Sequence, residues 1–439
     1  MGEIMSKLKK QFISNIPYYV LFFILLFIHI QLNVSTGDDV NFAIRAKSMT
    51  FTGFNIYKYY NWSSRQLIES VLYFISVHSH VWMLLNSLVI TIIAKLIEAI
   101  FCNHTIKMKI LCCIGTLIYP LIDMSSAGWM ATTINYYWPL GAILINLYYL
   151  KKANNLIKLK WYEYIISSIA LLFAANQEQG FAILLGTYFF YIIYCFINKR
   201  KISFFVILNI VLIIASGIYI FTCPGNWVRK KQEVKNWFPD FGTLSFFRKI
   251  EIGISSTVYP ILFKNNVPML FLSSTLLIII NTFKNSLVKA STMIIFVMTL
   301  VFGVLGKYLV DLYPNISFLY SILGKYGILS LSNLKSFFPY IMFLIEFIAL
   351  LIIILFLIKD NRKNIDIFIL LIGFGSRFML CFSPTVWVSG NRTALFFYFS
   401  MIIASCLLIS RYHHRIKNLD YFMAIFGVFA FCNIINCLV

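Results

Sequence analysis

Two adjacent acids, Asp38 and Asp39, follow Gly37 directly after the first long apolar segment of the chain. Neighbouring carboxylates repel one another, and partial burial would raise the pKa of at least one of them. Such a carboxylate suits a general base, which must be ionised and close to a hydroxyl proton. The alternative is a solvated loop start or a helix N-cap. Asp38 and Asp39 are therefore candidate catalytic residues, and the sequence does not choose between them.

Residues 176–180 place four polar side chains between two apolar segments with almost no loop. Polar groups at membrane depth are costly, so they must line a cavity or pair with something. Asn176 and Glu178 are therefore candidate substrate-binding residues. The alternative is a tight outer turn.

A cationic cluster follows at residues 223–231, where Pro224 must end the preceding helix and Gly225 permits close backbone approach. Arg229 and the two lysines after it would be explained by a bound anion such as a lipid phosphate. Asn226, in the same motif, is a candidate substrate-binding residue. The alternative is simple attraction to anionic lipid headgroups.

Two further arginines are candidate ligands of a phosphate. Arg377 lies inside an apolar segment, where a buried arginine is a functional hypothesis by default, and Arg392 follows in a polar stretch. Arg377 could instead pair with a carboxylate such as Asp123 or Glu178. Arg392 could instead extend its charged end toward the membrane interface.

Three residues of the aromatic-rich segments complete the candidate binding residues: Trp62, Arg65 and Trp138. Trp138 ends a stretch of small and aromatic residues that is typical of a re-entrant element. Tryptophan rings stack on sugar faces, but they also form the aromatic belts of membrane interfaces. The sequence has no convincing set of metal ligands, so we expect neither a metal nor another cofactor.

The composition indicates that a membrane scaffold positions these residues. Of the 439 residues 60% are hydrophobic and 12% are charged, whereas a soluble protein carries about 25% charged residues. The net charge of +21 does not predict nucleic-acid binding, because most Lys and Arg lie in short runs between apolar segments. The bilayer is therefore the expected solvent, and membrane lipids are the expected surroundings.

The apolar segments predict an all-α polytopic membrane protein with about 11–13 transmembrane helices. We expect one integral membrane domain over residues 1–439, with short amphipathic or re-entrant helices on its outer side. The expected spans are 17–34, 80–101, 110–124, 136–150, 163–176, 180–198, 203–222, 266–283, 290–306, 338–358, 365–382, 393–410 and 420–438.

Runs of basic residues between these spans predict the topology, because cytoplasmic loops are enriched in Lys and Arg. With the N-terminus in the cytoplasm, all the runs fall on one side and the C-terminus lies outside. The runs are Lys7, Lys9 and Lys10; Lys107 and Lys109; Lys151, Lys152, Lys158 and Lys160; Lys199, Arg200 and Lys201; Lys284 and Lys289; Lys359, Arg362 and Lys363; and Arg411, Arg415 and Lys417. The opposite side has the longer segments, which are 35–79, 125–135, 223–265, 307–337 and 383–392, and we expect the functional residues there.

These motifs together resemble the GT-C superfamily of polytopic glycosyltransferases, whose members use lipid-phosphate sugars and place acidic residues just after the first span. More narrowly, they are similar to a bacterial group that includes serotype-converting O-antigen glucosyltransferases, often phage-encoded. The motifs at 37–39, 176–178, 224–229 and 383–392 carry this resemblance. It covers most of the chain in topology but few residues in motif, and we do not expect the large C-terminal soluble domain that some members have.

The resemblance implies a GT-C-like core over about residues 1–265, with additional C-terminal spans over about 266–439. It implies that Asp38 or Asp39 takes the proton of an acceptor hydroxyl, and that Arg229, Arg377 or Arg392 binds the donor phosphate.

The same resemblance also implies the substrates and the pathway. The donor would be a polyprenyl-phosphate hexose, with glucose the expected sugar. The acceptor would be a lipid-linked or polymeric glycan such as the O-antigen of lipopolysaccharide, at the periplasmic face of a bacterial inner membrane. A small flippase and a polyprenyl-phosphate glucosyltransferase would act in the same pathway.

Rival classes of membrane protein remain open. A lipid-linked glycan transporter or flippase would show helices broken at the midplane and internal repeats. A polysaccharide polymerase typically has one large outer loop, and an acyltransferase would need a histidine deep in the membrane. Here the six histidines are expected at chain or loop edges, and the polar motifs gather on one side. That one-sided arrangement favours an enzyme.

Overall fold

The computed structural model describes residues 6, 9, 11–264, 266–329, 333–360 and 365–438. Across these residues every regular element is a helix, and the β-type pairing is one isolated bridge between Gly324 and Gly327. The protein is an all-α polytopic membrane protein, as its sequence predicts. Four residues of the predicted basic runs lie outside the described residues, namely Lys7, Lys10, Arg362 and Lys363.

The chain forms two compact units. The first unit comprises Met1–Gln232 and Ala430–Val439, and the second comprises Glu233–Phe429. The boundary between the units falls inside helix α12 (Pro224–Trp237), whereas the resemblance implied a core that ends at about residue 265.

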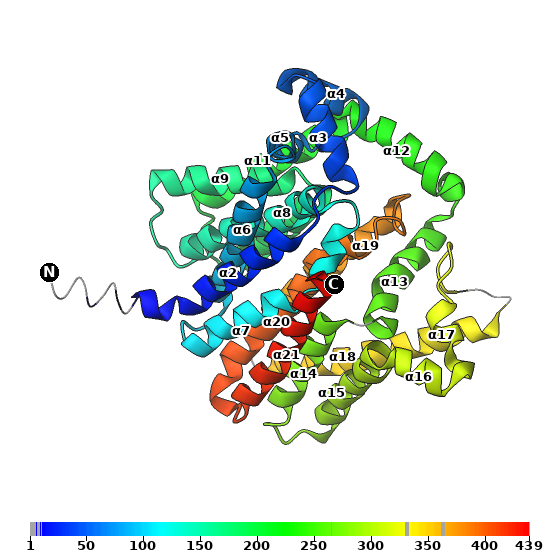
Figure 1. Cartoon of the computed structure of the whole chain (residues 1–439). Helices are drawn as coiled ribbons and strands as arrows, with labels where there is room; N and C mark the ends of the chain where they lie inside the picture. The colour runs from blue at the N-terminus through cyan, green and yellow to red at the C-terminus, as the bar shows by residue number, and fades with distance from the viewer. Residues whose placement is uncertain are drawn as a thin grey trace. The chain divides into compact units, whose positions relative to one another are not determined.

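The first unit contains a bundle of long helices and a group of shorter ones at one end. The shorter helices α3, α4 and α5 gather near the start of α12 (Figure 1). Together with α12, the helices of this unit are α2 (Ile16–Gln31), α3 (Asp38–Ser48), α4 (Phe51–Asn61), α5 (Gln66–Ile75), α6 (Ser79–Phe101), α7 (Ile106–Leu117), η1 (Leu121–Ser125), α8 (Trp129–Asn154), α9 (Trp161–Ala175), α10 (Glu178–Ile197) and α11 (Phe204–Thr222).

The second unit is also helical, and its last helix returns the chain to the first unit. Its helices are η2 (Pro239–Gly242), α13 (Phe246–Phe263), α14 (Val267–Ile280), α15 (Ser286–Met298), the π-helix η3 (Thr299–Val304), α16 (Gly306–Leu312), η4 (Pro314–Ile316), α17 (Phe318–Ser321), η5 (Leu334–Ser336), α18 (Phe337–Asp360), α19 (Ile365–Phe378), η6 (Met379–Phe382), η7 (Asn391–Ala394), α20 (Leu395–Tyr412), η8 (His413–Arg415) and α21 (Leu419–Leu438).

Every one of the predicted spans coincides with helical structure, but not every helix is long enough to cross a bilayer alone. Among the described residues, eight helices have the length and hydropathy of a membrane span, and the bent pair α13 and α14 would make nine. Helices α2 and α9 are apolar but shorter, with 16 and 15 residues. A span needs about 20 residues when it crosses the hydrocarbon core without help. Short length therefore keeps the predicted spans 17–34 and 163–176 out of this set, whereas α8, which covers the predicted span 136–150, has 26 residues and is also not among the eight. The multi-pass character is clear.

Buried polar side chains join the long helices of the first unit. The Asn146 amide on α8 donates to the Ser167 hydroxyl on α9 at 2.8 Å and to the Asn209 carbonyl oxygen on α11 at 2.9 Å. The Tyr188 hydroxyl on α10 donates to the Asn146 carbonyl oxygen at 2.9 Å. All four side chains are almost fully buried. In a hydrocarbon environment such groups bond across helices, because the alternative is an unsatisfied dipole. This junction holds α8 and α10, which carry the candidate site at their N-terminal ends.

Candidate functional site

Asp39 lies at the N-terminal end of helix α8, although it belongs to helix α3. Its two carboxylate oxygens accept hydrogen bonds from the backbone N–H groups of Ala131 at 2.7 Å and of Met130 at 3.1 Å. These are the second and third residues of α8, so Asp39 is an N-cap supplied from another part of the chain. A carboxylate there also faces the positive end of the helix dipole. The structure therefore gives Asp39 a stabilising role.

The turn before α8 requires glycine at this contact. Gly128 has a φ of +99°, and a Cβ atom there would lie 2.7 Å from the Asp39 carboxylate. Only glycine meets both the positive φ and the close approach without strain. Asp39 is 1% exposed, and burial raises its pKa to about 6 even though the backbone N–H groups of Ala131 and Met130 act in the opposite direction.

Asp38 differs from its neighbour. It is exposed on the first turn of α3, and its backbone N–H donates to the Ala127 carbonyl at 2.9 Å. Its side chain is exposed, whereas both carboxylate oxygens of Asp39 are buried in hydrogen bonds to the start of α8. Of the two candidate bases, Asp38 is the one whose carboxylate a substrate could reach.

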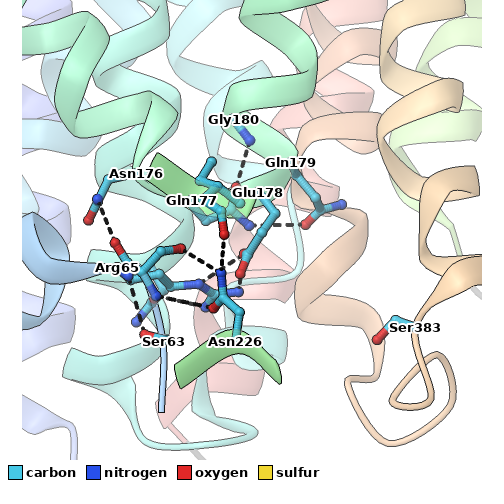
Figure 2. A network of polar contacts seen from close by, with 12 residues as sticks. Ser63, Arg65, Asn176, Gln177, Glu178, Gln179, Gly180, Asn226 and Ser383 are labelled. Carbon is cyan, nitrogen blue, oxygen red and sulfur yellow. Dashed lines mark hydrogen bonds and ion pairs between the residues drawn. The ribbon is translucent and has the colours of Figure 1, made fainter. Parts of the chain in front are cut away.

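Arg65 and Arg229, which come from distant segments, both pair with Glu178, the first residue of α10. Figure 2 shows Arg65 beside Glu178. The Arg65 guanidinium donates to Oε2 of Glu178 through Nε, at 2.9 Å, and through Nη2. Arg229 donates to Oε1 at 3.2 Å. The three side chains are 19–26% exposed, so a ligand can reach their charged groups from outside the protein. The sequence predicted each of Arg65, Glu178 and Arg229 as a site residue, and the structure brings them together.

A third helix contributes to this cluster. Nη1 of Arg65 donates to the Asn135 carbonyl oxygen on α8 at 3.0 Å. The Asn135 amide in turn donates to the backbone of Ala131, one turn earlier. Asn135 thereby fixes the third nitrogen of Arg65, and sequence reasoning did not select it as a site residue.

Two asparagines hold the segment that carries Arg65 (Figure 2). The Asn226 carbonyl oxygen accepts from the Ser64 backbone N–H at 3.1 Å, and the Asn176 amide donates to the Ser64 carbonyl at 2.9 Å. The Asn176 carbonyl oxygen also accepts from the N–H groups of Leu67 and Ile68, the second and third residues of α5. Asn176 and Asn226 thus position Arg65 by holding the chain on both sides of it. A direct role of either residue in substrate binding stays a prediction.

Gly225 allows α12 to approach this segment closely. A Cβ atom at Gly225 would lie 2.6 Å from the Tyr59 carbonyl oxygen and 2.7 Å from the Trp62 backbone nitrogen. No side chain fits in that space, because neighbouring backbone atoms cannot move aside cheaply. The glycine therefore lets Asn226 reach Ser64 and lets α12 present Arg229 to Glu178.

A buried ion pair joins α4 and α5, the two helices that flank the segment with Arg65. Nζ of Lys58 is 3.4 Å from Oε1 of Glu69, and the two side chains are only 7% and 5% exposed. Burial lowers the pKa of Lys58, and the nearby Glu69 carboxylate opposes this shift. Nζ also lies 4.4 Å from the centre of the Phe42 ring. The Ser63 hydroxyl donates to Oε1 of Glu69 at 2.9 Å. Sequence reasoning missed this pair, because neither residue stands in a motif.

The two tryptophans of the candidate set differ in their surroundings. Trp62 directly follows α4 as its C-cap and is 38% exposed, so its ring is available for contact. Trp138 lies inside α8, and its indole N–H donates to the Asn86 carbonyl oxygen at 3.2 Å. Since Asn86 belongs to α6, Trp138 links two helices of the bundle.

His29 forms the continuation of that link. The Asn86 amide contacts Nε2 of His29 at 2.8 Å, and Nδ1 of His29 contacts the Ser87 hydroxyl at 2.8 Å. Because the indole of Trp138 can only donate, the Asn86 oxygen faces the indole and the Asn86 amide donates to Nε2. His29 therefore carries its proton on Nδ1. It lies in the last turn of α2, at a segment edge as expected, but it is 3% exposed and fully engaged in helix packing.

Arg377 and Arg392 belong to the second unit. Arg377 is buried in the last turn of α19, and Arg392 is partly buried in η7. Their roles as phosphate ligands stay predictions. In the same unit, Arg411 of α20 bonds Asp366 of α19 at 3.2 Å. No group of three or more His, Cys, Asp or Glu side chains in the described part of the chain could hold a metal ion.

The fold and the site define a class of protein. The chain is a multi-pass, all-α membrane protein whose first unit carries a cluster of charged side chains at the ends of several helices. In comparisons with known proteins, no family model, no curated protein and no solved structure matches the chain. The function must therefore be argued from the site itself.

Proposed function

We propose that the protein is a membrane glycosyltransferase. It would move a hexose, with glucose the expected sugar, from a polyprenyl-phosphate donor to a surface polysaccharide such as O-antigen. The reaction would take place at the periplasmic face of a bacterial inner membrane, with the N-terminus in the cytoplasm. The observation that supports this proposal most is the convergence of Arg65 and Arg229 on Glu178 in the unit that also carries the exposed carboxylate of Asp38.

Guanidinium groups suit a phosphate that leaves a sugar. Arginine presents planar, fixed donors to phosphate oxygens and stays charged at any physiological pH. Arg65 and Arg229 come from segments that are 164 positions apart, yet both lie within hydrogen-bonding distance of one carboxylate. They are also partly exposed beside apolar helices. A lipid phosphate could reach them while its polyprenyl chain stays among the helices.

In the proposed reaction, the acceptor hydroxyl attacks the anomeric carbon of the hexose. Asp38 takes the hydroxyl proton as the new glycosidic bond forms. The bond between the anomeric carbon and the phosphate oxygen breaks, and its electron pair leaves with the polyprenyl phosphate. The arginines stabilise the charge that develops on that oxygen. Asp39 holds α8 in place and takes no part in proton transfer.

The test measures transfer of the hexose by cells that express the full-length chain. Mass spectrometry of the surface glycan, with and without the gene, reports whether one hexose is added. Asp38→Asn should lower transfer by about 10²–10⁴-fold, which is the usual contribution of a general base. Asp311→Asn is the matched control, because Asp311 is another exposed acid and lies on α16 of the second unit.

Two results would refute the proposal or its assignment. Full transfer by Asp38→Asn in membranes with normal amounts of protein would show that Asp38 is not the base. A surface glycan that is unchanged in mass by the wild-type gene, while lipid-linked glycan accumulates on one side of the membrane without it, would indicate a transporter instead.

A further inference from the structure

Glu178 is an unexpected residue in a site that is proposed to hold an anion. Its two oxygens are shared between two arginines, with Arg65 on Oε2 and Arg229 on Oε1. The Glu178 side chain is 26% exposed, so it faces the same space as the guanidinium groups. An incoming phosphate would meet the carboxylate as well as the arginines, and like charges repel.

The charge of the reaction product explains how this carboxylate can help the reaction. The proposed donor is a phosphate diester with one negative charge. The lipid phosphate that leaves is a monoester, with a second ionisation near pH 6 and a charge of about −1.5 to −2 at pH 7. Two arginines alone would therefore bind the product more tightly than the donor. A fixed carboxylate repels the product more strongly than the donor, because the repulsion scales with charge.

We infer that Glu178 is the internal counter-ion of the phosphate site. It orients the guanidinium groups of Arg65 and Arg229 while the site is empty, and it weakens binding of the product phosphate so that the product leaves. Glu178 is thus a positioning residue and not a catalytic one. The inference rests on the proposed function in that Arg65 and Arg229 receive the lipid phosphate.

Replacing Glu178 with glutamine separates this role from a merely structural one. A carboxylate accepts hydrogen bonds with both oxygens, whereas an amide has one accepting oxygen. Glu178→Gln therefore keeps one arginine in place, releases the other and removes the negative charge. A counter-ion that is lost strengthens phosphate binding. A purely structural support that is lost weakens it, because the arginines become disordered.

The experiment measures binding of farnesyl phosphate, a monoester with an isoprenoid chain, to the purified full-length protein by isothermal titration calorimetry in detergent. Glu178→Gln should bind at least tenfold more tightly than the wild type, or about 1.4 kcal/mol. Arg229→Gln should bind at least tenfold more weakly than the wild type. The affinity of Arg229→Lys should lie between those of the wild type and Arg229→Gln, because lysine keeps the charge without the planar donors.

Two control variants match the change at Glu178. Glu178→Asp retains the negative charge and should therefore not bind farnesyl phosphate more tightly than the wild type. Glu163 lies in the first turn of α9 and pairs with Lys152. Glu163→Gln removes this acid and should leave the binding of farnesyl phosphate unchanged. Thermal unfolding and size-exclusion profiles show that each variant is folded, and Glu178→Ala serves if the glutamine variant is not.

Each outcome decides between the two proposals. Tighter binding by Glu178→Gln supports the counter-ion role if product release is also slower. Product release is measured by comparing the single-turnover rate with the steady-state rate. Weaker binding by Glu178→Gln overturns it, and so does a wild type that fails to bind farnesyl phosphate. A wild type that binds farnesyl phosphate but transfers no hexose refutes the proposed transferase alone, because the binding series still tests Glu178.

Discussion

Substitution of Asp39 tests whether the two adjacent acids have separate roles. Asp39→Ala removes both acceptors of the Met130 and Ala131 N–H groups at the start of α8. Loss of an N-cap costs about 0.5–2 kcal/mol, and a buried donor left unsatisfied costs about 1–3 kcal/mol. Since Asp39 is 1% exposed, water cannot replace it, and we expect a loss of about 2–3 kcal/mol. Asp39→Asn keeps one accepting oxygen and should cost about half as much.

The assay follows unfolding with a thiol-reactive fluorescent dye. Eight of the nine cysteines are buried, so dye labelling reports loss of packing. A unit of this size shifts its melting temperature by about 2–4 °C per kcal/mol, which gives about 4–12 °C for Asp39→Ala. Asp38→Ala is the matched control, because Asp38 is exposed and surface changes stay within about 0.5 kcal/mol.

The pH dependence of stability gives an independent check on Asp39. Its pKa is about 6 in the folded protein, against 3.8 for an ordinary aspartate. The folded state therefore holds the proton more tightly than the unfolded state, so stability should fall as pH rises from about 4 to about 6 and then level off. The shift corresponds to a loss on the order of 2–3 kcal/mol. Asp39→Asn cannot titrate and should abolish this slope.

This reasoning is refuted if the two acids prove to have each other's roles. If Asp39→Ala melts with the wild type while Asp38→Ala melts far below it, Asp39 is not the cap of α8. If hexose transfer per folded molecule falls about 100-fold in Asp39→Asn but not in Asp38→Asn, Asp39 is the base.

Three further predictions concern the elements around the site. Lys58→Met should destabilise the protein by about 3–5 kcal/mol, since it leaves the Glu69 carboxylate buried without its cation, and Lys58→Met with Glu69→Leu should recover most of that loss in a thermal-melt double-mutant cycle. His29 should show the neutral Nδ1–H tautomer at pH 6 in nitrogen NMR of histidine-labelled protein, and an imidazolium there would contradict the hydrogen-bond assignment. Gly225→Ala should lower the melting temperature by several degrees and reduce transfer, because its Cβ would collide with the Tyr59 carbonyl, whereas Gly427→Ala has open space and should not.

The membrane architecture could be predicted from the sequence because its signal is local. Each of the predicted spans coincides with helical structure, since a run of apolar residues in a bilayer must satisfy its own backbone hydrogen bonds. Pro224 was correctly expected to end the preceding helix, and α11 ends at Thr222 with Cys223 extended before α12 begins. The segment 35–79 contains the short helices α3, α4 and α5, and their expected place on the outer side stays a prediction.

The contacts of the site could not be predicted, because they join distant segments. Arg65 and Glu178 are 113 positions apart, and Asp39 and Ala131 are 92 apart. An Asp-Asp pair after a span is equally consistent with a base, a local cap or a distant cap. Only the packing of α3 on the start of α8 shows that Asp39 is a distant cap. The polar stretch at 176–180 did indicate that its side chains must pair, but not with which partners.

The meeting of these segments explains why a short polar motif can serve both folding and function. Asn176 holds α5, and Gln177 caps its own helix by accepting from the Gly180 N–H at 2.7 Å. Glu178, between the cap and the helix, binds the two arginines. The neighbours of Glu178 fix its backbone, so in the proposed site the carboxylate would bear the repulsion of an approaching phosphate without the helix end unfolding. In the proposed site, a carboxylate that competes with the phosphate needs a fixed backbone, and the hydrogen bonds of Asn176 and Gln177 on its N-terminal side would provide it.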